Sequence, residues 1–168
     1  MPVIAAVSGI KNTGKTTLIT RLIPCFTGRG LKTAVIKHDG HEFEADVPGT
    51  DSWSHKRAGA YGTAVFSAGK FMVVKEQRDT GVRELMGYFP EADVILLEGF
   101  KNSVYPKVEL VRRETAPEPV CDPRFVMAYV TDIKEPRPWK DGVLCFDFDE
   151  VEALADFLLE QEAFGINF

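Results

Sequence analysis

Short apolar runs alternate with stretches of helical periodicity at the start of the chain. Val3–Val7 is a continuous apolar run, which is typical of a strand buried on both faces of a parallel sheet. From Lys15 the pattern becomes helical and ends near Gly28, and a second strand is predicted at Thr33–Lys37. A strand, a helix and a strand within about 35 residues predict a right-handed βαβ unit, so the first two strands should be parallel.

The later runs predict further strands and helices. Strands are expected at Thr63–Ser67, Phe71–Lys75, Asp93–Leu97, Val108–Val111 and Phe125–Val130. Helices are expected from Asp51 or Ser52 to Ala60, over Gly81–Phe89, and from about Asp149 to Glu162. The first two of these strands flank Ala68 and Gly69, which predicts a β-hairpin inserted in the sheet. We therefore expect an α/β fold with a mostly parallel sheet, in a single domain over residues 1–168.

Length, composition and charge narrow the class of protein. A chain of 168 residues with 45% hydrophobic and 27% charged residues can bury a core and is not disordered. Its net charge of −5 is unevenly placed, with +4 in residues 1–90 and −9 in residues 91–168. A protein that wraps nucleic acid is usually basic, so nucleic acid is not an expected partner.

The cysteines and the apolar runs set an expectation about compartment. Cys25, Cys121 and Cys145 are odd in number and widely spaced, so they predict neither a disulfide framework nor a zinc pair. The first apolar run is too short for a signal peptide, and no run reaches the roughly 20 apolar residues that span a bilayer. We expect a cytoplasmic protein.

A phosphate-binding motif lies between the first predicted strand and the first predicted helix. Residues 9–16 match G-x-x-x-x-G-K-[ST] in full, in the position that this motif requires. Its glycines let backbone N–H groups converge on phosphate oxygens. In this interpretation Lys15 reaches the β and γ phosphates, and the Thr16 hydroxyl binds Mg²⁺. The other candidate nucleotide contacts are Gly9, Lys11, Asn12, Thr13, Gly14 and Thr17.

Two features of this loop leave alternatives open. Lys11 can also be a solvated charge or a contact between subunits. The whole motif can also be a glycine-rich turn without a ligand, because its pattern specifies only four positions. The flanking strand and helix favour nucleotide binding.

Two acidic residues follow predicted strands, at the edge where ligands collect in sheets of this kind. Asp39 follows the second predicted strand, and Glu98 follows Asp93–Leu97. Either carboxylate can accept hydrogen bonds from the waters that Mg²⁺ retains. Thr16, Asp39 and Glu98 are therefore the candidate magnesium ligands, and Lys15, Asp39 and Glu98 are the candidate catalytic residues. The alternative for each acid is a strand-end carboxylate without a ligand.

All three histidines fall within one polar segment after the second predicted strand. His38, His41 and His55 lie within eighteen residues and have carboxylates nearby. Such a set would suit zinc or nickel. No cysteine supports it, so a metal site here is one alternative.

Four segments carry a family resemblance. They are GIKNTGKTTL, KHDGHEFEADVPGTDSWSHKRAGA, LLEGFK and YPKVELVR, and together they resemble the molybdopterin-guanine dinucleotide biosynthesis protein B (MobB) family over most of residues 3–112. The resemblance implies a three-layer P-loop NTPase fold, binding of GTP and Mg²⁺, and weak GTPase activity. It also implies a homodimer whose hairpin extends a sheet across the subunits. The implied partners are molybdopterin and the molybdenum cofactor guanylyltransferase, which joins GMP to it.

The resemblance further implies roles for particular residues. The triphosphate would be bound by residues 9–17, and Mg²⁺ would be surrounded by Thr16, Asp39 and Glu98. The mouth of the site would be lined by His38, His41, Asp51, His55 and Arg57, and positive charge for a phosphate would come from Lys101, Lys107 and Arg112. The guanine-reading motif [NT]-K-x-D is absent, because residues 131–134 read TDIK. Asp132 could still accept from the guanine edge, so the choice of GTP over ATP rests on the resemblance.

Three functions stay open from the sequence. The leading one is a GTP-dependent accessory protein for molybdenum cofactor maturation. No arginine finger or switch glutamine is visible, so turnover should be slow, at about 10⁻⁴ to 10⁻² per second as in unassisted GTPases. The alternatives are a small-molecule kinase with Asp39 or Glu98 as general base, and a metal-delivery GTPase that uses the histidine segment as carrier.

Overall fold

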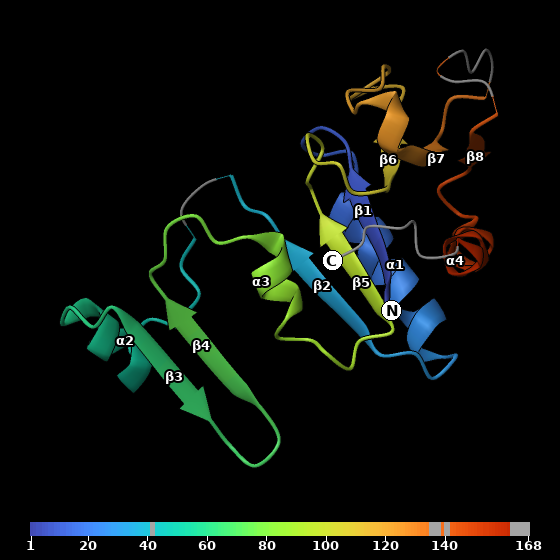
Figure 1. Ribbon diagram of the computed structural model, residues 1–168. Helices are drawn as coiled ribbons and strands as arrows, with labels where there is room; N and C mark the ends of the chain where they lie inside the picture. Colours follow the sequence, from blue (N-terminus) through green and yellow to red (C-terminus); the bar gives the residue numbers. More distant parts are fainter. Residues whose placement is uncertain (41–42, 135–138, 140–141, 162–168) are drawn as a thin grey trace. The chain divides into compact units, whose positions relative to one another are not determined.

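The computed structural model describes residues 1–40, 43–134, 139 and 142–161. The chain divides into two compact units: Met1–His38 with Leu85–Phe168, and Asp39–Glu84. The first unit contains a six-stranded sheet, and the second contains a short helix and a hairpin (Figure 1). The single domain over residues 1–168 stays a prediction. No helix among the described residues is long and apolar enough to cross a membrane.

A parallel sheet forms the first unit. Its strands are β1 (Val3–Ser8), β2 (Thr33–Lys37), β5 (Val94–Glu98), β6 (Lys107–Val111), β7 (Val126–Thr131) and β8 (Leu144–Phe146), in the order β2-β5-β1-β6-β7-β8. Each neighbouring pair is parallel. The carboxyl ends of β5, β1 and β6 therefore meet at one edge of the sheet. The three-residue strand β8 was not predicted, because so short a run has no periodicity to detect.

Apolar side chains cover both faces of this sheet. On one face, α1 (Lys15–Thr27) and α4 (Val151–Glu160) pack their apolar stripes against β1, with Leu22 and Leu158 fully buried. Residues of the opposite face are also buried, among them Ala6 and Leu97. Burial on both faces explains why these strands are continuously apolar and not alternating. It also confirms the three-layer α/β class. The predicted helix end at Glu162 lies outside the described residues.

One of the remaining helices is shorter than the periodicity suggested, and a 3₁₀ turn lies where no helix was predicted. The segment α3 (Val82–Met86) is contained within the predicted Gly81–Phe89. A single 3₁₀ turn, η1 (Pro123–Phe125), precedes β7 and has Asp122 as its N-cap. Its proline occupies the first position, where no backbone N–H is needed.

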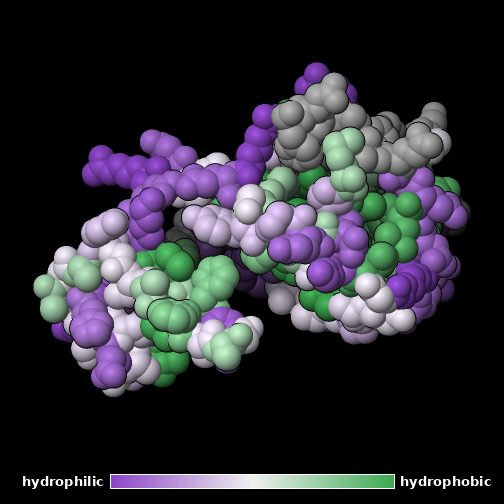
Figure 2. Space-filling view, turned by 60° about the horizontal axis from the view of Figure 1, so that its bottom comes forward, coloured by the Kyte–Doolittle hydropathy of each residue, from purple (hydrophilic) through white to green (hydrophobic). Residues whose placement is uncertain are grey.

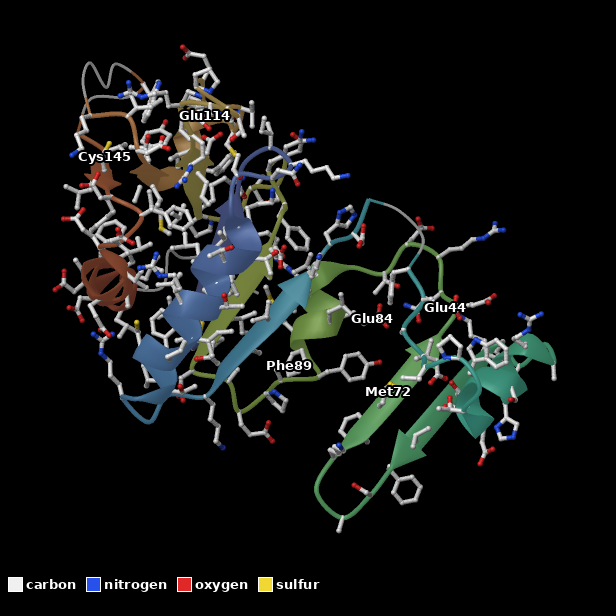
Figure 3. All side chains as sticks on the ribbon, turned by 180° about the vertical axis from the view of Figure 1, so that it is seen from behind. Glu44, Met72, Glu84, Phe89, Glu114 and Cys145 are labelled. Atoms are coloured by element: carbon white, nitrogen blue, oxygen red, sulfur yellow. The ribbon has the colours of Figure 1, made fainter. Side chains whose placement is uncertain are left out.

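The second unit holds the hairpin that is inserted in the chain between β2 and β5. Strands β3 (Gly62–Phe66) and β4 (Phe71–Lys75) are antiparallel, and Ser67 N donates to Lys70 O across the turn at 2.8 Å. They form a two-stranded sheet of their own among the described residues, and Met72 of β4 is labelled in Figure 3. The apolar pattern predicted both strands but could not specify their pairing partners.

A short helix, α2 (Asp51–Arg57), precedes the hairpin. Thr50 is its N-cap and accepts from Trp53 N at 3.4 Å, so the predicted caps Asp51 and Ser52 are wrong by one or two positions. The helix also ends three residues before the predicted Ala60, because Gly59 adopts φ +103°. Within the same unit, Lys56 pairs with Glu44 at 3.6 Å.

Candidate functional site

The loop between β1 and α1 has the geometry of a phosphate cradle. Gly9, Asn12 and Gly14 adopt φ of +138°, +66° and +96°, which curls the backbone. A Cβ at Gly9 would lie 2.8 Å from Leu110 O, and one at Gly14 would lie 2.9 Å from Phe148 Cζ. Gly14 is also the N-cap of α1 and provides no side-chain cap. The first-turn N–H groups of α1 are therefore available to an anion.

Three loop side chains have different roles in this structure. Lys15 Nζ folds back and donates to Ile10 O at 2.6 Å and to Gly9 O at 3.3 Å. Thr13 is buried and donates to Ile10 O at 3.0 Å, so its side chain braces the loop from inside. Lys11, Asn12 and Thr17 are exposed. The predicted triphosphate contacts therefore lie on the loop and on the first turn of α1, with the Lys15 ammonium folded against the loop carbonyls.

Thr16 and Glu98 meet although 82 positions separate them in the sequence. Thr16 Oγ1 donates to Glu98 Oε1 at 2.6 Å. Glu98 ends β5 and is only 8% exposed, while Thr16 lies in the first turn of α1. The pairing of β1 with β5, Val7 opposite Glu98, brings the two elements together. Two of the three predicted magnesium ligands are therefore adjacent.

Positive charge surrounds the Glu98 carboxylate. Lys37 Nζ, at the end of β2, lies 3.8 Å from Glu98 Oε1. Desolvation lowers the pKa of Lys15, the nearby Glu98 charge opposes that shift, and the charges of Lys101 and Lys37 lower the pKa further. Lys37 and Lys101 therefore both act electrostatically on Lys15, and Lys37 also pairs with Glu98. Such a cluster gains stability when an anion binds to it.

The segment after β5 closes the cradle from the side. Gly99 N donates to Val7 O at 3.0 Å, and Ser8 Oγ donates to Gly99 O at 2.5 Å. His38 N donates to Glu98 O at 3.2 Å, and its ring lies 5.6 Å from the Phe100 ring. The backbones of β1, β2 and β5 thus hold His38 and the 99–100 segment beside Glu98.

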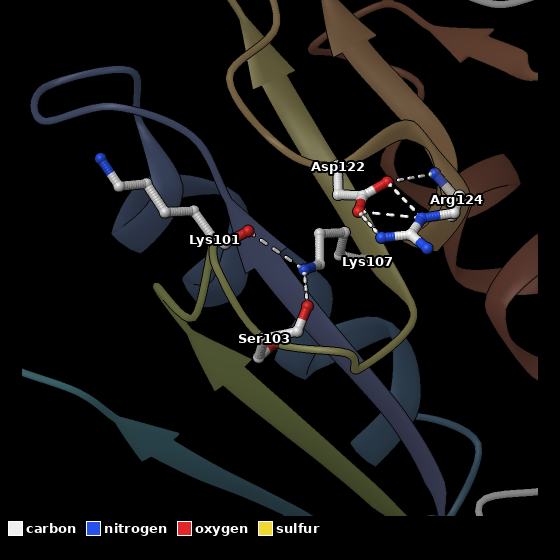
Figure 4. A network of polar contacts seen from close by, with 5 residues as sticks. All are labelled: Lys101, Ser103, Lys107, Asp122 and Arg124. Carbon is white, nitrogen blue, oxygen red and sulfur yellow. Dashed lines mark hydrogen bonds and ion pairs between the residues drawn. The ribbon is translucent and has the colours of Figure 1, made fainter.

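Lys107 does not supply surface charge for a phosphate, and the expectation that it does is wrong. Its side chain is fully buried at the start of β6. Its Nζ donates to Ser103 O at 2.6 Å, Lys101 O at 3.2 Å and Phe100 O at 3.4 Å (Figure 4). An ammonium group has three donors, and these carbonyls accept all three. The site residue Lys101, in contrast, is exposed.

Asp132 and Arg112 lie together at the carboxyl ends of β7 and β6. Asp132 Oδ1 accepts from Arg113 N at 2.8 Å, and Asp132 Oδ2 lies 3.3 Å from Arg112 Nε. The Arg112 guanidinium stacks over Phe148 at 4.5 Å from the ring centroid, and Phe148 packs against Gly14. The two residues therefore lie beside the start of α1, where they form a donor and acceptor pair.

Other predicted site residues belong to the second unit or lie outside the described residues. Asp39 is the first residue of the second unit, so its part in the magnesium site stays a prediction. Asp51 and His55 are exposed on α2, and the Arg57 guanidinium lies 4.9 Å from the centroid of the Trp53 ring. His41 lies outside the described residues. Within the described part of the chain, no group of three or more metal-ligating side chains is present.

Three residues at the site were not predicted. Ser8 and Phe148 carry no sequence signal, because their contacts join elements 91 and more than 130 positions apart. Lys37 could have been found, since it ends a predicted strand directly before His38 at the edge where ligands collect. Contacts between distant elements are what a pattern along the chain cannot show.

The fold and the site define the class of this protein. A parallel sheet of this order, with a glycine-rich loop between its first strand and first helix, is a P-loop NTPase fold. The family model described as "Molybdopterin guanine dinucleotide synthesis protein B" matches residues 3–132. The chain belongs to this MobB family.

Individual relatives agree with that assignment. The chain is 36% identical over 155 residues to the Escherichia coli (strain K12) protein named molybdopterin-guanine dinucleotide biosynthesis adapter protein, covering 88% of this chain and 86% of that one. It is 31% identical over 156 residues to the Haemophilus influenzae protein of the same name, covering 90% of this chain and 85% of that one. The crystal structure of Bacillus subtilis MobB matches with a TM-score of 0.73 and 32% identity, covering 96% of this chain and 100% of that one.

Proposed function

We propose that this protein binds GTP with Mg²⁺ and serves as an accessory protein in the formation of the molybdopterin guanine dinucleotide cofactor. The observation that carries the proposal is the convergence of Lys15 and the open first turn of α1 with the Thr16–Glu98 pair. Membership of the MobB family and relatives named as adapter proteins of this biosynthesis support the pathway.

The donor atoms of the site fit Mg²⁺. This ion prefers hard oxygen ligands and keeps several waters. The Thr16 hydroxyl would bind it directly, and the Glu98 carboxylate, with Asp39 as proposed third residue, would accept from its waters. When bound, the ion supplies charge neutralisation for the β and γ phosphates. Thr16 and Glu98 are already positioned by β1, β5 and α1, so little rearrangement of the backbone is needed.

Selection of guanine is assigned to the Arg112–Asp132 pair. A carboxylate can accept from the guanine N1–H and N2–H₂ groups, and a guanidinium can donate to O6. Adenine presents the opposite pattern on that edge. Asp132 would have to exchange its contact with Arg112 for the base, and Arg112 would keep its stacking on Phe148.

Hydrolysis by the isolated protein is expected to be slow. Phosphoryl transfer needs a positioned water and additional positive charge in the transition state. Among the described side chains near the cradle, Arg112 is paired with Asp132, and Glu98 is engaged by Thr16 and Lys37. The proposed partners are the guanylyltransferase that transfers GMP and molybdopterin, which is the substrate of that enzyme. We propose that this protein acts with them as a homodimer. His38, which follows β2, would contribute to the nucleotide site, and the same role for His41 stays a prediction.

The proposal is tested by titrating GTP and ATP, each with Mg²⁺, into wild-type protein and the Lys15→Ala variant in a calorimeter. Lys15→Ala should lose about 2 to 3 kcal/mol of GTP binding, about 30- to 150-fold, because one charged donor to phosphate is removed. The fold should persist, since Lys15 contacts only carbonyls of its own loop.

The matched control is Lys32→Ala, which removes an exposed lysine at the amino end of β2. This variant should bind GTP as the wild type does. Equal GTP affinity in the wild type and Lys15→Ala would refute nucleotide binding at this loop. Equal affinity of the wild type for ATP and GTP would refute the guanine assignment alone.

A further inference from the structure

A buried lysine anchors the loop that follows β5. The 99–103 loop, defined here as Gly99–Ser103, connects β5 toward β6, which lie on opposite sides of β1. Lys107, at the start of β6, is 0% exposed and donates to the carbonyls of Phe100, Lys101 and Ser103. Figure 4 shows the Lys107 ammonium between the carbonyls of Lys101 and Ser103. One side chain therefore ties three positions of a five-residue loop.

The strand itself is irregular where this lysine leaves it. The register of β6 against β7 shifts between Lys107 and Val108. Such irregularities redirect a side chain and are frequent beside active sites. Burial lowers the pKa of Lys107, whereas the charges of Cys121, Glu109 and Asp122 raise it. Burial of a lysine costs free energy unless its donors are satisfied. Here the carbonyls of the 99–103 loop satisfy them, so the burial of Lys107 and the conformation of this loop depend on each other.

The loop backbone needs such an anchor. Gly99 and Phe100 adopt consecutive positive φ values of +100° and +54°. A bulky residue such as phenylalanine rarely adopts positive φ, and strained positions persist only where their surroundings over-determine them. Phe100 O accepts from Lys107 Nζ, from Ser103 N at 3.0 Å and from Ser103 Oγ at 2.7 Å. Three donors on one carbonyl supply that constraint.

The anchored loop presents a charged side chain at the nucleotide site. Lys101 is exposed, and its side chain extends away from the Lys107 ammonium (Figure 4). Its charge lies near enough to Lys15 to lower the pKa of that residue. Glu98, which directly precedes the loop, is bonded to Thr16 at 2.6 Å. Lys101 therefore belongs to the cation group around the predicted γ-phosphate position.

We propose that Lys101 is the residue that distinguishes a triphosphate from a diphosphate, and that the buried Lys107 is a positioning residue that acts through it. Lys15 lies at the start of α1 and would contact either nucleotide, whereas Lys101 belongs to the loop that follows Glu98, the carboxylate bonded to Thr16, and would contact only the third phosphate. Without its three contacts to Lys107, the loop would lose its strained conformation. The Lys101 side chain would then no longer be held at the nucleotide site. The inference rests on the proposed function, because it assumes a nucleotide in the cradle.

The test measures the ratio of affinities for a non-hydrolysable GTP analogue and for GDP, each with Mg²⁺, by calorimetry. Lys101→Ala should lower this ratio about tenfold, the size of one charge-assisted contact. Methionine has a shape similar to that of lysine but no hydrogen-bond donors, so Lys107→Met should lower the ratio of affinities by the same factor. The double variant should be no worse than either single variant, because both changes remove the same contact. Lys32→Ala should leave the ratio unchanged.

Each outcome decides one part of the proposal. An unchanged ratio in Lys101→Ala, which alters only an exposed side chain, overturns the proposal. Reductions that multiply in the double variant overturn the action of Lys107 through Lys101. If circular dichroism shows that Lys107→Met does not fold, Lys107→Gln takes its place in the cycle, and an unchanged ratio in that folded variant overturns the positioning role. A wild-type protein that binds neither nucleotide would refute the proposed function itself, which is a separate result.

Discussion

Identical residue types have opposite roles in this protein, depending on where the fold places them. Lys101 and Lys107 are six positions apart, yet the first is exposed and the second is fully buried among carbonyls. Glu98 and Glu109 are both buried at the sheet. Glu98 binds Thr16 at the candidate site, whereas Glu109 accepts from Val120 N and Cys121 N and holds a loop. Burial and partners, not residue type, assign these roles.

The environment of Glu109 also leads to a prediction about alkaline pH. Burial, followed by the charge of Glu109 and a hydrogen bond to it, raises the pKa of the Cys121 thiol to about 12. A raised pKa means that the folded state favours the protonated thiol. Its contribution to stability is therefore complete below about pH 9 and is lost as the pH rises from there toward 12.

The measurement is denaturant unfolding of the wild type and Cys121→Ala between pH 8 and about 10.5. The wild type should lose more unfolding free energy over this range than the variant does. Comparing slopes and not absolute stabilities removes the cost of the small cavity that alanine leaves. Parallel curves would contradict the prediction.

At the scale of elements, the cradle depends on contacts from outside its own motif. Gly14 has φ +96°, and the Phe148 ring, which follows β8, fills the space where a side chain would lie. Gly30, after α1, has φ +77° but nothing within 4 Å of a Cβ. Substitutions at the two glycines therefore separate the cost of a side chain at positive φ from the cost of a clash with Phe148.

Gly14→Ala and Gly30→Ala form a matched pair for testing this. Gly30→Ala should lose about 1 to 2 kcal/mol of stability, the cost of a left-handed residue. Gly14→Ala should lose more, since Phe148 must move, and should also weaken GTP binding. Chemical denaturation and calorimetry measure the two effects. Equal stability losses with unchanged GTP affinity would show that the Phe148 contact is unimportant.

At the scale of the whole molecule, the hairpin unit carries apolar side chains that its own fold leaves exposed. Phe66 and Phe71 are directly opposed in the hairpin register and are 83% and 68% exposed. Val73 lies on the same face, because residues alternate along a strand. Figure 2 shows apolar surface on this unit. Exposed patches of this kind mark interaction sites, which supports the proposed homodimer.

The homodimer is tested by sedimentation velocity. The wild type should sediment as a dimer, and the double variant Phe66→Ser with Phe71→Ser should sediment as a monomer, because the apolar area that drives association is removed. Val104→Ser, which changes an exposed apolar residue of the first unit, should remain dimeric. A dimer that survives in the double variant would place the interface elsewhere.

Local patterns determined much of this protein. Strands β2 and β4 have the predicted bounds, β1 and β6 differ from prediction by one residue at one end, and β5 and β7 differ by one residue at each end. Residues 9–14 form the predicted loop between a strand and a helix, and Lys15 and Thr16 begin that helix. These features depend on neighbours along the chain, namely the continuous apolar runs of a buried parallel sheet and the glycines that a tight loop requires. The resemblance of the motifs also indicated the family correctly.

Only the tertiary structure decided which distant residues meet. The Thr16–Glu98 bond spans 82 positions, and the Arg112–Asp132 pair joins the ends of two strands. The same packing buried Lys107, which had been expected at the surface. Strand order produces all three results, because it determines which carboxyl ends lie side by side and which side chains lose contact with water. The amino-acid pattern specifies which residues form each strand. The packing energy summed over the whole sheet specifies which strands lie next to one another.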